Sequence, residues 1–165
     1  MSILRMTWLL RGIAGWLWVA ALGVSSAAAQ VRVDASEGMI AYRSDVGFAE
    51  TMERAEPAIE ARGLFVMRVI DHAAAAKQVG RELSPNTVVL FGNPKIGSQV
   101  MTCAPRAGID LPQKLMVWEE DGAVFVAYND PQHLVWRHSI EGCEDLLARV
   151  AENLDGLARE VAGGG

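Results

Sequence analysis

The sequence lacks the motifs that would identify a reaction. Its 165 residues include only two cysteines and three histidines. The cysteines do not form a Cys-x-x-Cys pair, which argues against thiol–disulfide exchange as the main activity. No Gly-x-Ser-x-Gly nucleophile elbow and no glycine-rich dinucleotide fingerprint is present. The sequence therefore points to no known catalytic class, and we expect neither a cofactor nor a metal.

Basic residues are also scarce. Lysine and arginine number 15 against 20 acidic residues, which gives a net charge of −5. A duplex nucleic-acid binder needs a basic face, so we expect no nucleic-acid partner. The composition, 51% hydrophobic and 21% charged, excludes a disordered chain. One globular domain is the natural expectation for this length.

The only long apolar run lies at the N-terminus. Arg5 and Arg11 precede an uncharged stretch over 12–24, and small residues follow up to Ala29. This order is typical of a signal peptide over 1–29, with cleavage before Gln30. An uncleaved anchor is the alternative, but Arg11 interrupts the length that a spanning helix needs. We expect a periplasmic or secreted protein that leaves the membrane after cleavage.

The mature chain divides simply. We expect a flexible segment over 30–40, a single domain over 41–161, and a disordered glycine tail over 162–165. Hydrophobic patterns predict strands over 39–43, 64–70, 87–91, 115–118 and 123–128. Asp71, Pro94 and Asp130-Pro131 mark helix starts, and an apolar stripe predicts a last helix over 143–161, with Asp155 on its polar side. Strands mixed with helices indicate an α+β two-layer domain with a mainly antiparallel sheet.

Two local features of the sequence make predictions that the structure can test. Ser44 or Asp45 can cap a helix that follows, but Pro57 lies inside the helical pattern, and we expect a kink or a break there. Asp121-Gly122 predicts a tight hairpin turn. The strand after this turn is apolar on both faces, so its second face should be covered by another layer, a partner subunit or a ligand.

Many blocks of the sequence follow a familiar order: 71–73, 80–85, 89–97, 104–105, 108–112, 114, 118–119 and 128–131. With these blocks the chain resembles the family called domain of unknown function 302, over about 41–158. The resemblance implies a small α+β sandwich, similar to the TATA-box-binding-protein layout and commonly paired into homodimers. It implies no DNA binding and no activity.

The best candidate site is the turn from Gly92 to Gly97, where a buried strand ends and a helix begins. Free amides at the helix start, together with Lys95, would suit a small anion. A turn that needs these residues for geometry alone is the alternative. Polar residues near strand ends complete the predicted ligand site, which comprises Gly92, Asn93, Lys95, Gly97, Asp110, Lys114, Glu119 and Asn129.

Other reactive side chains give weaker signals. His72 could act as an acid or base, or could tie down a loop. His133 and His138 are wrongly spaced to share one helix face as metal ligands. Cys103 and Cys143 could form a disulfide in an exported protein, or could be two buried thiols.

Three functional hypotheses follow. The first is a non-catalytic module that binds a small anionic ligand at the 92–97 turn. The second is a metal-free enzyme that uses His72 with Lys95 or Lys114. The third is a structural homodimer subunit of a periplasmic complex. Whether the protein is an enzyme is left open, with a binding role favoured.

Overall fold

A computed structural model describes residues 32–36 and 38–164, and the predicted signal peptide lies outside these residues. The described elements, in chain order, are β1 (Arg32–Ser36), β2 (Met39–Arg43), α1 (Phe48–Glu60), β3 (Phe65–Asp71), α2 (His72–Gln78), β4 (Asn86–Gly92), α3 (Pro94–Cys103), the 3₁₀ helix η1 (Pro105–Ile109), β5 (Gln113–Glu120), β6 (Ala123–Asn129), α4 (Pro131–His138) and α5 (Glu144–Val161).

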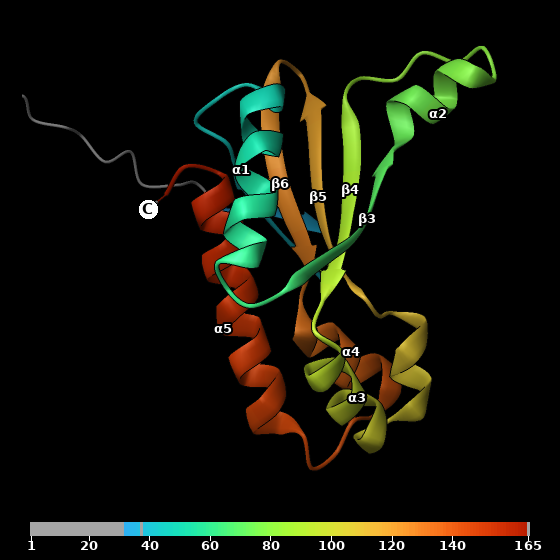
Figure 1. Ribbon diagram of the computed structural model, residues 1–165, viewed down its shortest axis with the longest axis vertical. Coiled ribbons are helices and arrows are strands. Elements are labelled where there is room, and N and C mark those ends of the chain that lie inside the picture. Colours follow the sequence, from blue (N-terminus) through green and yellow to red (C-terminus); the bar gives the residue numbers. More distant parts are fainter. Residues whose placement is uncertain (1–31, 37, 165) are drawn as a thin grey trace, which may run out of the picture.

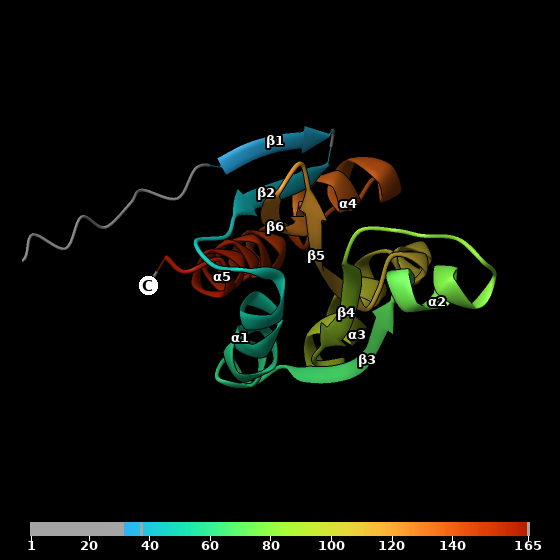
Figure 2. The ribbon, with the colours of Figure 1, turned by 90° about the horizontal axis from the view of Figure 1, so that it is seen from above.

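The strands form one six-stranded sheet in the order β1-β2-β6-β5-β4-β3, with every neighbouring pair antiparallel. Helices α1 and α5 lie together on one face of the curved sheet (Figures 1 and 2). Helices α3 and α4 and η1 gather below the sheet, beside the lower half of α5 (Figure 1). This arrangement confirms an α+β fold built on an antiparallel sheet. No helix in the described part of the chain is long and apolar enough to cross a bilayer.

Two apolar clusters hold these parts together. The larger lies between the sheet and the α1–α5 layer and includes Ile59, Phe91 and Leu157, all fully buried. The smaller joins α3, η1 and α4 to the first turn of α5 through Val100, Leu134 and Leu147. Helix α5 belongs to both clusters and links the sheet layer to the helices below it.

The hairpin prediction is confirmed. β5 and β6 are joined by Asp121 and Gly122, whose φ angles are 51° and 73°. Positive φ at both central positions matches the tight turn that suits twisted antiparallel strands. On the sheet face away from α1 and α5, Trp118 and Phe125 stack with ring centroids 5.1 Å apart. Only part of that face is covered within the described chain, since these two side chains remain half-buried.

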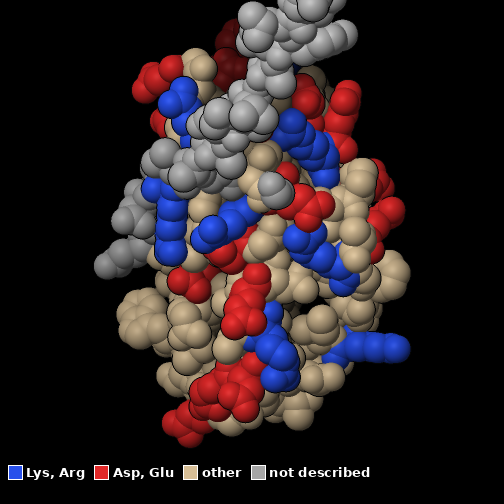
Figure 3. All heavy atoms as spheres, turned by 90° about the vertical axis from the view of Figure 1, so that its left-hand side faces the viewer, with Lys and Arg blue, Asp and Glu red and all other residues tan. Residues whose placement is uncertain are grey.

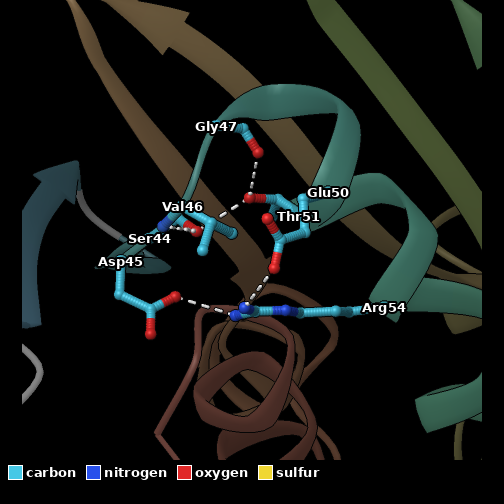
Figure 4. Close-up of polar contacts among 7 residues, drawn as sticks. All are labelled: Ser44, Asp45, Val46, Gly47, Glu50, Thr51 and Arg54. Atoms are coloured by element: carbon cyan, nitrogen blue, oxygen red, sulfur yellow. Dashed lines mark hydrogen bonds and ion pairs between the residues drawn. The ribbon is translucent and has the colours of Figure 1, made fainter.

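Helix α1 differs from its prediction at its start. Its N-cap is Gly47, and neither Ser44 nor Asp45 caps it. Instead the Ser44 hydroxyl lies 2.7 Å from that of Thr51, while Asp45 pairs with Arg54 at 2.8 Å (Figure 4). These side chains brace the loop before the helix rather than its first free amides.

Pro57 does not break α1, which continues to Glu60. The proline removes one amide donor, which would otherwise bond to the Glu53 carbonyl, and its ring occupies an exposed position in the last turn. The buried neighbours Ala55, Ala58 and Ile59 hold the helix on both sides of the proline. The expected break at Pro57 is therefore wrong, and a kink there stays a prediction.

Both chain ends of the domain are more ordered than expected. The segment 30–40, predicted to be flexible, contains β1, which pairs with β2. At the other end, the first residues of the predicted disordered tail are held in place. Ala162 is fully buried and its carbonyl accepts a bond from the Asp45 amide at 3.0 Å, and the Gly164 amide donates to Arg159 at 2.9 Å.

Candidate functional site

The predicted turn from strand to helix is present. β4 ends at Gly92, Asn93 caps α3, and Pro94 is the first helical residue. The Asn93 side chain accepts a hydrogen bond from the Lys95 amide at 2.9 Å. The Asn93 carbonyl accepts bonds from the amides of Ile96 and Gly97, at 2.9 and 3.0 Å. Proline has no amide proton, so the first donors of α3 are already used.

The expectation of open amides at this helix start was therefore wrong. An anion would have to displace the asparagine cap, and the hydrogen bond from Asn93 Nδ2 to the Gly63 carbonyl at 3.1 Å holds that side chain in place. Lys95 is exposed and does not line the nearest cavity. The turn thus takes the geometric role that was the alternative to an anion site.

Asp110 and Lys114 form a structural brace instead of a ligand site. Lys114 Nζ donates to the carbonyls of Asp110 and Pro112, at 2.7 and 2.9 Å. Burial lowers the pKa of Lys114, although the nearby Asp110 carboxylate opposes this effect. The Asp110 carboxylate itself accepts a bond from Arg137 at 3.0 Å and lies 2.5 Å from His138 Nε2. These contacts fasten η1 to α4 and to β5.

The other predicted site residues are scattered over the fold. Glu119 lies near the hairpin, at the opposite end of β5 from Lys114. Asn129 ends β6 on the sheet face away from Tyr128, because side chains alternate along a strand. Of the eight predicted ligand residues, only Gly92, Asn93 and Gly97 line a common cavity.

His72 is separated from both lysines. It begins α2, directly after the end of β3 where Asp71 pairs with Thr87. Lys95 follows the other end of β4, and a seven-residue strand spans about 20 Å. Lys114 lies two strands across from β3 and pairs with Leu90, three residues along β4 from Thr87, which puts its backbone about 14 Å from the end of β3. The structure therefore does not bring together the acid–base pair of the enzyme hypothesis. Within the described residues, no group of three His, Cys, Asp or Glu side chains could hold a metal ion.

A large cavity lies where the sheet meets the lower helices. Its volume is about 640 Å³, within the range of roughly 300–1,000 Å³ that is usual for small-molecule sites. Leu64 and Phe91 line it from the sheet side, Ile96 and Val100 from α3, and Leu147 and Val150 from α5. The polar groups on its wall are few, and Asn93, Gln113 and Asn153 are among them. An apolar wall with a few polar groups is the usual chemistry of a small-molecule pocket.

A disulfide joins the two helices that wall this cavity. Cys103, the last residue of α3, is bonded to Cys143, which precedes α5. The structure thereby decides between the paired and the separate thiols that the sequence left open. Because the bond fixes one end of α3 against the start of α5, it limits how far the two walls can separate.

A second polar cluster escaped the sequence analysis. Asp155, predicted to lie on the polar side of α5, accepts hydrogen bonds from the Tyr42 hydroxyl and, at 3.2 Å, from the Tyr128 hydroxyl. Arg159 Nε donates to the same carboxylate at 2.8 Å, and its guanidinium lies 5.3 Å from the Tyr42 ring centroid. The one available signal was the position of Asp155 beside Leu154 and Leu157, at the edge of the apolar stripe.

The cluster shifts the protonation equilibria of its members. Burial, and then the charge of Asp155, raises the pKa of Tyr128 well above its ordinary value. Burial and the hydrogen bond to Asp155 likewise raise the pKa of Tyr42. Burial alone would raise the pKa of Asp155, but the hydrogen bonds from the tyrosines and the Arg159 charge lower it. The cluster joins α5 to the sheet, and its polar groups already form hydrogen bonds with one another.

Comparison with known proteins agrees with this architecture. A family model described as "Domain of unknown function DUF302" matches residues 40–161, which include both walls of the cavity. The chain belongs to the DUF302 family. The crystal structure of an uncharacterized conserved DUF302 protein from Bacillus stearothermophilus aligns with a TM-score of 0.71 at 20% identity. That alignment covers 76% of this chain and 99% of the other, and it shows a shared fold.

Curated proteins with similar sequences carry a different name. The DUF302 chain is 33% identical over 128 residues to "Fluoride-specific ion channel FluC 1" of Brucella suis biovar 1 (strain 1330). It is equally similar to the protein of the same name from Brucella abortus biovar 1 (strain 9-941). The match covers 77% of this chain but only 50% and 47% of those relatives. The chain thus spans about half the length of the curated relatives it matches.

Proposed function

We propose that this DUF302 domain is an exported, non-catalytic module that binds a small, mainly apolar molecule in the cavity between α3, α5 and the ends of β3 and β4. The cavity of about 640 Å³ is the observation that carries the proposal. Burial of apolar ligand surface there would contribute roughly 25 cal/mol per Å² before the costs of binding are subtracted. The predicted signal peptide and the Cys103–Cys143 disulfide both favour an oxidising compartment outside the cytoplasm.

This proposal keeps the binding role expected from the sequence but changes the chemistry of the ligand. The 92–97 turn contributes Gly92, Asn93 and Gly97 to the cavity wall, while the helix amides are used internally. A bare halide would need several hydrogen-bond donors to replace its water shell. The apolar wall is a poor match for such an ion, so the cavity gives no support to fluoride as its ligand.

Gly97 offers a direct test. It lies inside α3 at the cavity wall, and a Cβ added there would meet only Leu111 Cδ1, at an ordinary 3.9 Å. Gly97→Leu should therefore fill part of the cavity without backbone strain. We expect wild-type protein to bind the neutral fluorescent probe N-phenyl-1-naphthylamine saturably, and the Leu variant to lose at least tenfold in affinity.

Gly97→Ala is the matched control. It adds one methyl group and should stabilise α3 by up to about 1 kcal/mol, because glycine is a poor helix former. The Ala variant should bind the probe within about twofold of wild type. Equal binding by the Leu variant and wild type, with both folded by circular dichroism, would remove the cavity as the site. Absence of saturable binding to wild type would do the same.

A further inference from the structure

We infer that the cavity takes an amphiphile with one anionic head group, whose apolar body lies between α3 and α5 and whose head pairs with Arg149. The inference rests on the proposed binding function and adds the class of ligand. Among the described residues that line the cavity, Arg149 alone has a charged side chain. The rest of the wall is apolar or neutral.

Arg149 is placed at the boundary between cavity and solvent. It lies on α5 between Leu147 and Val150, which both line the cavity. It also borders a smaller hollow of about 440 Å³ that surrounds the disulfide. The side chain is exposed, so a head group paired with it would remain partly hydrated while the ligand body is buried. An amphiphile has this combination of one charged, hydrated end and one apolar body.

The guanidinium of Arg149 is available for such a partner. Four other arginines of the described chain, Arg54, Arg62, Arg137 and Arg159, form ion pairs with carboxylates. Arg149 forms none within the described residues, although Asp145 precedes it by one helical turn. Since a guanidinium matches a carboxylate or phosphate in a two-pronged geometry, a single arginine can select an anionic head.

The surroundings favour a small ligand over an anionic macromolecule. On the face that α1 and α5 form, acidic and basic side chains lie next to one another, with no extended basic field (Figure 3). Glu144 and Asp145 also line the hollow beside Arg149 and would repel a polyanion. One positive charge at the mouth of an apolar cavity therefore fits one negative charge on an apolar molecule.

Three probes with the same ten-carbon chain test this assignment: decanoate, 1-decanol and decyltrimethylammonium. Each is titrated by calorimetry below its micelle concentration. We expect decanoate to bind wild-type protein roughly three- to tenfold more tightly than decanol, the range for a partly exposed charge pair. The cationic probe should bind most weakly. Arg149→Gln should bring decanoate to within about twofold of decanol and leave decanol unchanged.

Arg81→Gln is the matched control, because Arg81 is an exposed arginine outside the cavity lining. It should leave the affinities for all three probes unchanged. If decanoate and decanol bind wild type equally, or if Arg149→Gln does not alter their ratio, the anionic head group is wrong. The cavity function survives that result provided that Gly97→Leu still weakens probe binding by at least tenfold. If none of the probes binds, the proposed function fails and the ligand class fails with it.

Discussion

Asp155 accepts hydrogen bonds from Tyr42 on β2 and from Tyr128 on β6, and it pairs with Arg159 one turn later on α5. A hydrogen bond to a charged group contributes about 1.5–3 kcal/mol, more than a bond between neutral groups. The cluster therefore ties the long helix to two strands at a point where apolar packing gives way to solvent. Its contribution to the stability of the fold explains the cluster, and no catalytic role is needed.

The two tyrosines give this cluster a pH signature. Their pKa values are raised in the folded protein, so above about pH 10 the unfolded chain loses protons that the folded chain keeps. The free energy of unfolding should then fall as the pH rises beyond about 10, whereas below that value these groups add no pH dependence. Urea denaturation at a series of alkaline pH values measures the slope.

The chain has only two tyrosines, so ultraviolet absorbance of tyrosinate reports on this pair alone. We expect it to rise in folded protein at a higher pH than in urea-unfolded protein. Tyr128→Phe should remove part of the alkaline slope, and it serves as the matched variant. Coincident titration curves for the folded and unfolded protein would contradict the shared cluster.

At the scale of elements, α3 is fixed at both ends. Asn93 caps its start and bonds to Gly63, and the Cys103–Cys143 disulfide holds its end against α5. The bond spans a sequence separation of 40 residues. In the loop-entropy description, closing a loop of this length stabilises the fold by roughly 4 kcal/mol.

Replacing both cysteines by serine should therefore lower the free energy of unfolding by about 4 kcal/mol. The loss should also weaken probe binding, because one wall of the cavity is no longer fastened. Thermal denaturation and N-phenyl-1-naphthylamine titration measure the two effects. Wild-type protein treated with reductant is the control and should behave like the double variant. A double variant as stable as the oxidised wild type would show that the bridge adds nothing.

Elements whose signals are local could be predicted from the sequence. The Asp121-Gly122 hairpin, the Asp71 cap of α2 and the long α5 all follow from turn chemistry, capping and periodicity. Asn93 also carried a local signal, since asparagine is a favoured N-cap that consumes the amides thought to be open. The prediction treats Asn93 as part of the turn and overlooks its role as an N-cap.

Features that depend on distant contacts could not be predicted. Ser44 is a favourable cap residue for α1, but its hydroxyl bonds to Thr51, and Gly47 is the N-cap instead. The cavity forms where α3 and α5 come together, although they lie about 50 residues apart in the chain. Hydrophobic periodicity describes single elements and does not predict a contact between two of them. His72 and Lys95 are both exposed, and the end of the sheet that each one follows likewise depends on how the strands pair.

At the scale of the whole molecule, β3 is one of the two edge strands of the sheet and carries exposed apolar side chains. Phe65 is 59% exposed and Val69 is 51% exposed. An exposed apolar edge can pair with another strand, and a symmetric pair of edges is a common homodimer interface. The homodimer expected from the family resemblance stays a prediction, and this edge is where we place it.

Val69→Lys tests that interface, since a lysine on an edge strand opposes edge-to-edge pairing. Light scattering should give twice the protomer mass for wild type and a single protomer mass for the variant. Val69 does not line the cavity, so N-phenyl-1-naphthylamine binding should persist in the monomeric form. A wild-type mass that equals one protomer at every concentration would rule out the dimer.

Helix α5 begins beside the lower helices and ends beside the sheet (Figure 1). Residues of α5 from Leu146 to Leu154 line the cavity, whereas its last residue, Val161, lies beside the sheet near the C-terminal end (Figure 1). From Leu154, the last residue of α5 on the cavity wall, to Val161 the axial rise is about 10 Å. An affinity tag or surface tether attached behind Gly164 would therefore be joined to a segment that does not line the cavity. Immobilised protein can be used for the binding measurements.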